Sequence, residues 1–321
     1  MTGVQTCALP IWIRLGTLVA IPSNRIAPVT ASAIATINKL APGRVILAIG
    51  TGYTGRNTMG LPAISVNRLK EYTRQVQGLL SGEDVLFREG ERERWIRLVH
   101  PDHESFINIK DPIPVYLAAN GPRALQAVGE LADGWVTTFR SRRSLEPNFA
   151  KIANAAEQAG RGPVKPYTVA LTSGCVLREG ESLTSDRVVA QLGPSILVGM
   201  HAQWEAVYGP GADLGAQPDA DLAAAYNTYI QEYAQTSGTP SDRLYLDVHR
   251  GHMVFLKPGE ERFATESALA RTLTGSGPEI IGQLEVMEAA GIDNVVVSVP
   301  NAQGARDFIQ DFSREVIAKR G

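Results

Sequence analysis

Short apolar runs alternate with amphipathic stretches along most of the chain. The apolar runs, rich in Val, Ile and Leu, predict buried strands at 12–20, 44–50, 113–119, 134–139, 167–177 and 294–299. The stretches between them, with apolar residues three and four positions apart, predict helices at 28–40, 63–82, 122–132, 144–160, within 183–235, 277–291 and 302–319. This alternation predicts an α/β protein with a parallel sheet buried on both faces.

Two segments interrupt the alternation. Residues 83–112 begin with a charged stretch, "EDVLFREGERERWIRLV", which predicts a surface hairpin. Residues 200–263 are polar and aromatic, and we expect them to form a lid or pocket wall. The candidate pocket residues, for which core packing is the alternative, are Trp204, Tyr226, Tyr229, His249, His252 and Phe255. Both an open doubly wound sheet and a closed (β/α)8 barrel of the TIM type fit the remaining pattern.

The opening residues "MTGVQTCALPIW" match no targeting signal. They contain no Lys or Arg, and Pro10 interrupts their apolar run, so neither a secretory signal nor a transit peptide is indicated. Written as codons, residues 1–11 resemble a translated sequencing adapter. We therefore predict that 1–11 are not native, that 12–321 form the functional domain, and that a barrel would be N-terminally truncated, lacking its first two strands.

Composition narrows the class of protein. The chain has 321 residues, 44% of them hydrophobic, and a formal net charge of -2, which is typical of a globular protein with a large core. It has no basic excess, so we expect no nucleic acid partner, and it has no apolar run long enough to span a membrane. Cys7 lies in the suspected adapter and leaves Cys175 alone, which favours a cytoplasmic protein without disulfides. Homo-oligomerisation remains open.

The motif "GTGYTG", Gly50–Gly55, matches the G-x-G-x-x-G dinucleotide fingerprint directly after a strand. The acidic partner would be Glu71, but this residue falls inside a predicted helix, and that helix is expected to start only near 63. We therefore interpret the glycines as a strand-end loop whose backbone lies against a flat cofactor. An NAD-dependent Rossmann dehydrogenase remains an alternative.

Two turns have the pattern of anion sites at helix starts. In "AANGPRALQAVGELADG", Asn120 and Gly121 give a tight turn, Pro122 opens a helix and Arg123 could add positive charge, which together suit a phosphate. In "TGSGPEI", Ser276 and Glu279 predict a capping box, which requires no ligand.

The histidines and the cysteine indicate no catalytic centre. His249 and His252 in "HRGH" lack the spacing of a zinc helix, so we predict a pocket or loop role and no metal site. His100 and His103 are expected to be solvated, and His201 to lie on a helix face. Cys175 sits within an apolar strand, which predicts a core position.

Longer stretches carry a family resemblance. The segment "RLGTLVAIPSNRIAPVTASAIATINKLAPGRVILAIGTG" and the later blocks "VYLAANGPRALQAVGELADGW" and "LTGSGPEIIGQLEVMEAAGIDNVVVSVP" resemble the bacterial luciferase-like oxidoreductases. Within this superfamily of luciferase-like monooxygenases, the chain is most similar to the branch of methylenetetrahydromethanopterin reductase. The resemblance implies a (β/α)8 barrel that binds FMN or the deazaflavin coenzyme F-420. It also implies hydride transfer with a small organic substrate, in some members followed by oxygen insertion.

The resemblance also implies a set of cofactor-binding residues. Thr17, Leu18 and Val19 correspond to a strand bulge with a non-proline cis peptide behind the flavin ring. Thr51, Gly52 and Tyr53 correspond to the loop along the ring or ribityl chain, and Asn120, Gly121 and Pro122 to the phosphate turn. Asn24 and Arg25 correspond to positions near the cofactor mouth. The family's reacting residues precede the "RLGT" block, so no catalytic acid or base can be assigned, and we expect this fragment to bind cofactor poorly. A non-catalytic flavin-binding barrel is a further alternative.

Overall fold

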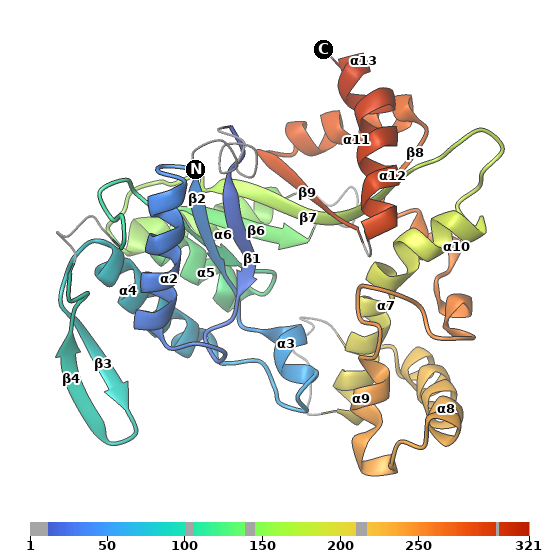
Figure 1. Ribbon diagram of the computed structural model, residues 1–321, viewed down its shortest axis with the longest axis horizontal. Helices are drawn as coiled ribbons and strands as arrows, with labels where there is room; N and C mark the ends of the chain where they lie inside the picture. Colours follow the sequence, from blue (N-terminus) through green and yellow to red (C-terminus); the bar gives the residue numbers. More distant parts are fainter. Residues whose placement is uncertain (1–11, 101–105, 139–144, 210–216, 300–301, 321) are drawn as a thin grey trace, which may run out of the picture. The chain divides into compact units, whose positions relative to one another are not determined.

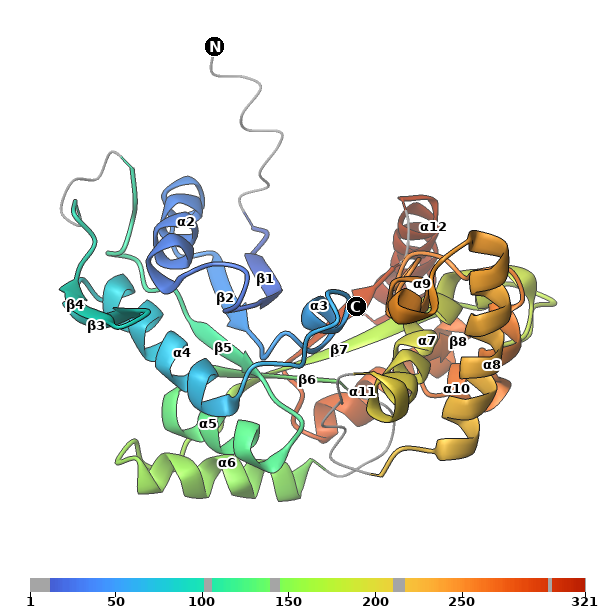
Figure 2. The same cartoon turned by 90° about the horizontal axis from the view of Figure 1, so that it is seen from below.

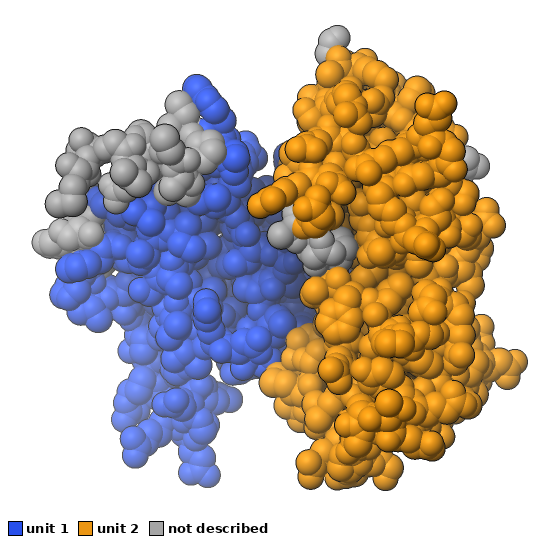
Figure 3. All heavy atoms as spheres, turned by 45° about the vertical axis from the view of Figure 1, so that its right-hand side comes forward, with its two compact units in different colours: residues 1–53, 64–136, 148–167 blue, residues 54–63, 137–147, 168–321 orange. Residues whose placement is uncertain are grey.

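The computed structural model describes residues 12–100, 106–138, 145–209, 217–299 and 302–320, which divide into two compact units (Figure 3). Unit 1 takes the chain up to Tyr53, Ile64–Val136 and Asn148–Tyr167, and unit 2 takes Thr54–Ala63, Thr137–Pro147 and the chain from Thr168 onward. The expected adapter, residues 1–11, lies outside the described residues. The single domain over 12–321 stays a prediction.

Unit 1 is built on parallel strands. In spatial order these are β1 (Leu15–Ala20), β2 (Val45–Ile49), β5 (Val115–Ala118) and β6 (Gly134–Thr138) (Figure 1). Val45, Leu47, Ala48 and Ile49 are buried, as expected for a strand covered on both faces. Because neighbouring parallel strands run the same way, the segments that follow β1, β2 and β5 emerge at one edge of the sheet.

Four helices accompany this sheet. They are α2 (Ala27–Leu40), α4 (Val66–Leu80), α5 (Pro122–Leu131) and α6 (Glu146–Gln158), and α4 packs against both α2 and α5 (Figure 2). The buried face of α2 is made mostly of small side chains, which allows close helix packing, and the buried Tyr72 hydroxyl of α4 donates a 2.6 Å hydrogen bond to Thr30 of α2. The charged hairpin is confirmed as β3 (Val85–Glu89) paired antiparallel with β4 (Arg92–Ile96).

Unit 2 is built around the long strand β7 (Tyr167–Val176). It pairs in parallel with β8 (Leu273–Gly275) and with β9 (Asn294–Ser298). The helical elements are α7 (Asp186–Tyr208), α8 (Ala220–Ser237), a 3-10 turn (Ser241–Arg243), α9 (Leu244–Val248), a second 3-10 turn (Glu260–Phe263), α10 (Glu266–Leu269), α11 (Gly277–Ala289), α12 (Ala302–Phe312), a π-helical turn (Ser313–Ile317) and α13 (Ala318–Arg320). An apolar core including Trp204, Tyr226, Tyr229 and Val248 joins α7, α8 and α9.

The structure corrects three details of the sequence analysis. The described residues contain seven strands in parallel pairs, four in unit 1 and three in unit 2, where the pattern predicts six. The missed strand is β8, which has only three residues and resembles part of a turn in the sequence. A short helix, α3 (Tyr53–Asn57), directly follows Gly52, whereas the sequence predicts no helix before 63. The predicted helical section 183–235 contains two separate helices, α7 and α8.

Other local predictions are confirmed. Ser276 and Glu279 form the capping box of α11, and Cys175 is a buried free thiol whose pKa burial raises to about 11. Within the described residues, none of the helices combines the length and apolar character needed to cross a membrane.

Candidate functional site

The end of β1 carries a bulge at the position that the sequence marks. The pairing of β1 with β2 shifts register between Thr17 and Ala20, and the peptide bond between Leu18 and Val19 is cis. The Thr17 hydroxyl donates a 2.8 Å hydrogen bond to the carbonyl of Ala48 and accepts one of 3.1 Å from its N–H. The non-proline cis peptide expected at this block is therefore present, and Thr17 ties the bulge to the neighbouring strand.

The loop after β2 requires its glycines for steric reasons. A Cβ at Gly50 would lie 2.8 Å from Cγ2 of Val19. Gly52 has a φ of +78°, in the left-handed region, and a Cβ there would lie 2.3 Å from Cγ2 of Ile21. The "GTG" pattern thus brings the loop after β2 against the end of β1, with Gly50 beside Val19 and Gly52 beside Ile21.

This loop does not make a dinucleotide fold. The helix that follows Gly52 is only five residues long, and the long helix begins at Val66. Glu71 lies within that long helix, as the sequence predicts, where it pairs with Arg68 at 3.2 Å. The ribose-binding geometry of the fingerprint is therefore not formed.

The turn after β5 exposes a helix start. The Ala119 carbonyl accepts a 2.8 Å hydrogen bond from the Trp135 indole, and Pro122 occupies the first turn of α5. Gly121 is the N-cap residue and supplies no side-chain cap, and a Cβ built on it would meet nothing within 4 Å. Asn120, Gly121 and Pro122 therefore leave open space at the positive end of a ten-residue helix, a setting that suits an anion.

A pocket opens beside the segment that follows β1. It has a volume of about 350 Å³. Its lining residues are Pro22, Ser23, Asn24, Arg25, Ile26, Ile64 and Arg68. Arg25 and Arg68 contribute guanidinium groups to this lining, although Arg68 is also paired with Glu71, and such groups can bind an anion. The sequence analysis identified Asn24 and Arg25 but missed Arg68, which is brought here because Ser65 caps α4 and fixes its first turn beside the loop.

Unit 2 places most of the candidate pocket residues in its core, which was the alternative to a lid or pocket wall. Trp204, Tyr226 and Tyr229 are core residues, His249 is also buried, and Phe255 is half exposed. The Tyr226 hydroxyl donates to Glu260 Oε1 at 2.5 Å, and Lys257 Nζ donates to the same oxygen at 2.5 Å. Sequence analysis missed Lys257 and Glu260. Their only signal was a Lys and a Glu three positions apart within the segment 200–263.

The electrostatics of this cluster follow from its burial. Burial opposes ionisation of Glu260, but hydrogen bonds from His201, Lys257 and Tyr226, together with the Lys257 charge, lower its pKa to about 2. Burial likewise lowers the pKa of Lys257, although Glu260 counteracts this, and raises the pKa of Tyr226 far above its usual range. The cluster is therefore a buried ion pair held by a tyrosine hydroxyl.

Parallel strands covered by helices, with glycine-containing turns at their carboxyl ends, are typical of α/β enzymes, including those of the barrel class. Comparison with known proteins agrees. The model of the luciferase-like monooxygenase family matches residues 12–294, so the chain belongs to this family. The predicted membership in this oxidoreductase superfamily is thereby confirmed.

Particular relatives refine the comparison. The chain is 29% identical over 290 residues to an F420-dependent glucose-6-phosphate dehydrogenase of Nakamurella multipartita, covering 87% of this chain and 80% of the relative. Its fold is similar to that of the coenzyme F420-dependent tetrahydromethanopterin reductase of Methanopyrus kandleri, with a TM-score of 0.60, 20% identity and coverage of 96% and 83%. The oxygenating constituent of a Pseudomonas putida diketocamphane monooxygenase, in complex with FMN, gives a TM-score of 0.54 at 14% identity, with coverage of 96% and 80%. The predicted α/β barrel class is confirmed by these likenesses, while the two missing strands stay a prediction.

Proposed function

We propose that this protein transfers a hydride between a flavin-type cofactor, coenzyme F-420 or FMN, and a small organic substrate. The observation that carries the proposal is the bulge at Leu18–Val19 meeting the glycine loop of β2, next to the open turn after β5, in a chain of this family. The relatives use F420 in two cases, and a third holds FMN. When bound, the cofactor supplies the redox chemistry.

The residues present fit such a cofactor. Thr17, Leu18 and Val19 would support one face of the ring, with Thr17 anchored to β2. Thr51, Gly52 and Tyr53 would line its side, where the absence of a Cβ at Gly52 allows close packing on Ile21. Asn120, Gly121 and Pro122 would receive the phosphate at the start of α5, where the space at Gly121 is open.

The pocket with Arg25 and Arg68 favours F-420 over FMN. F-420 carries further anionic groups beyond its phosphodiester, and the pocket lined by Arg25 and Arg68 suits them. We also propose that the substrate is a small molecule and that the protein acts in the cytoplasm. The two alternatives, an NAD-dependent dehydrogenase and a non-catalytic flavin-binding barrel, are not favoured by the fold or by the relatives.

The phosphate turn allows a sharp test. Replacing Gly121→Asp puts a carboxylate where the phosphate should lie, yet Asp is a favourable N-cap residue and the backbone at φ -87° accepts it. Gly121→Asn, of the same shape but neutral, is the matched control. We expect the aspartate variant to bind F-420 and FMN at least about tenfold more weakly, since a hydrogen bond to a charged group contributes about 1.5–3 kcal/mol, with unchanged thermal stability.

Cofactors without phosphate complete the experiment. Riboflavin, and the deazaflavin chromophore without its phosphate tail, should bind both variants equally in fluorescence titrations. Equal loss of riboflavin and FMN binding would place the phosphate elsewhere, and tight binding of NADH with no binding of either flavin would overturn the proposed function.

A further inference from the structure

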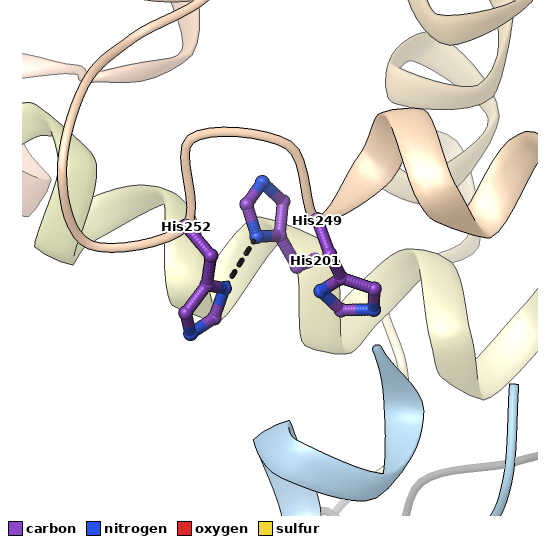
Figure 4. A group of neighbouring side chains, drawn as sticks. All are labelled: His201, His249 and His252. Carbon is purple, nitrogen blue, oxygen red and sulfur yellow. Dashed lines mark hydrogen bonds between the residues drawn. The ribbon is translucent and has the colours of Figure 1, made fainter. Parts of the chain in front are cut away.

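Three histidines converge in unit 2, although they come from distant parts of the sequence. His201 lies on α7, whereas His249 and His252 follow α9 (Figure 4). Each offers a ring nitrogen, and these three atoms lie within 4.8 Å of one another. Nδ1 of His201 and Nδ1 of His252 are 3.2 Å apart. Two nitrogens bound to one tetrahedral zinc ion at about 2.0–2.1 Å each would be about 3.4 Å apart, close to this spacing.

The outer nitrogens of two of these rings contact carboxylates. Nε2 of His249 lies 2.7 Å from Oε1 of the fully buried Glu205, and Nε2 of His201 lies 3.4 Å from Oε1 of Glu260. A carboxylate accepts the N–H of each ring, so the lone pair of each ring is left at Nδ1. This carboxylate–histidine arrangement is the one that orients histidine ligands in metal sites.

Protein partners leave two ring nitrogens of this cluster unsatisfied. Nδ1 of His249 and Nε2 of His252 are both buried and have no hydrogen-bond partner in the described part of the chain. His252 can donate its Nδ1–H to His201, but this leaves the lone pair at its own Nε2 without a donor. A cation bound at Nδ1 of each ring would use the lone pair of His249 that otherwise has no partner.

Acidic side chains lie behind the three rings. Two carboxylates, Glu205 and Glu260, lie behind the ligands, whereas one cation, Lys257, is paired with Glu260. The negative charge around the rings thus exceeds the positive charge.

We propose that His201, His249 and His252 bind one divalent late transition-metal ion, with Zn²⁺ as the ion of choice. The ligands are all imidazole nitrogens with no thiolate, which suits zinc and its neighbours better than Mg²⁺ or Ca²⁺. Three histidines leave a fourth position for water. Sequence spacing excluded zinc at "HRGH" because only two of the ligands lie there; the third comes from α7, about fifty residues earlier. This site is independent of the proposed cofactor site in unit 1.

The test uses the full chain without a polyhistidine tag and without flavin. After treatment with EDTA and dialysis, titration with Zn²⁺ by calorimetry should give about one ion per chain, and Co²⁺ should give the visible absorption of a tetrahedral site. Zn²⁺ should also raise the melting temperature by about 5 °C. Binding of less than a tenth of an equivalent, or no cobalt spectrum, would overturn the proposal.

Variants assign the ligands. His252→Ala and His249→Ala should each lower Zn²⁺ affinity by about a hundredfold or more, and Glu205→Gln by about tenfold. His100→Ala, at an exposed position in unit 1, is the matched control and should bind as the unmodified chain does. Far-UV circular dichroism in EDTA verifies that each variant is folded, and Glu205→Gln keeps the proposal testable if a histidine variant unfolds. Unchanged affinity in both histidine variants would refute the site.

Discussion

The two candidate sites of this protein are built in opposite ways. In unit 1 the strand-end turns act through the backbone: a cis peptide, a glycine at positive φ and an open N-cap position. In unit 2 the histidine and Lys257–Glu260 cluster acts through side chains that meet only after α7 and the segment after α9 have packed together. Backbone sites leave a local pattern in the sequence, whereas side-chain sites assembled over long separations leave almost none.

The largest expected effect tests the side-chain region. Lys257→Met removes the cation and leaves Glu260 buried without it, which should lower the free energy of unfolding by about 3–5 kcal/mol. The double variant Lys257→Met/Glu260→Gln removes both charges and should recover part of this loss. Urea unfolding in EDTA measures both effects. If the single variant loses less than the double variant, the pair does not hold the cluster together.

This contrast explains what the sequence could predict. Most strands and helices follow from hydrophobic periodicity, and Thr17–Val19 and Thr51–Tyr53 follow from a family pattern with glycines at fixed positions. β8 and α3 were missed because three and five residues are too short to show a period. The neighbours of His201 could not be predicted, because no local pattern specifies which turn of α7 faces the segment after α9.

The next effect tests the backbone region. Gly52→Ala introduces a Cβ 2.3 Å from Ile21 at a residue with φ of +78°, and it should cost about 2–4 kcal/mol from strain and overpacking together. Gly43→Ala is the matched control, because Gly43 has φ of +67° but no atom within 4 Å of the new Cβ. That variant should cost only about 1–2 kcal/mol. If chemical denaturation gives equal losses of stability for the two variants, the loops after β1 and β2 do not pack closely enough to exclude a Cβ at position 52.

A smaller effect distinguishes residues that stabilise unit 1 from residues that bind the cofactor. Tyr72→Phe deletes the buried hydrogen bond to Thr30 that joins α4 to α2, and it should cost about 1 kcal/mol. Cofactor affinity should not change, since the proposed binding residues lie in the turns and not between these helices. A double-mutant cycle with Thr30→Val measures the interaction energy between the two side chains. A fall in cofactor affinity without loss of stability would mean that the helix pair positions the site directly.

The smallest expected effect tests whether ion pairing alone, or ion pairing combined with burial, explains how the cluster of unit 2 stabilises the fold. Glu181 and Arg187 form a bidentate pair in the same unit, but both side chains are partly exposed. The hydrogen bonds from Arg187 are the main reason that the pKa of Glu181 falls from 4.5 to about 2. A carboxyl group whose pKa is lower in the folded state stabilises the fold above its unfolded pKa, and this stabilisation disappears as the pH falls from about 4.5 towards 2.

Glu181→Gln should therefore lower stability by less than about 1 kcal/mol at pH 7, and its melting temperature should approach that of the unmodified chain as the pH falls from 5 to 3. A loss as large as that of Lys257→Met would show that pairing alone, without burial, accounts for the stability of the cluster.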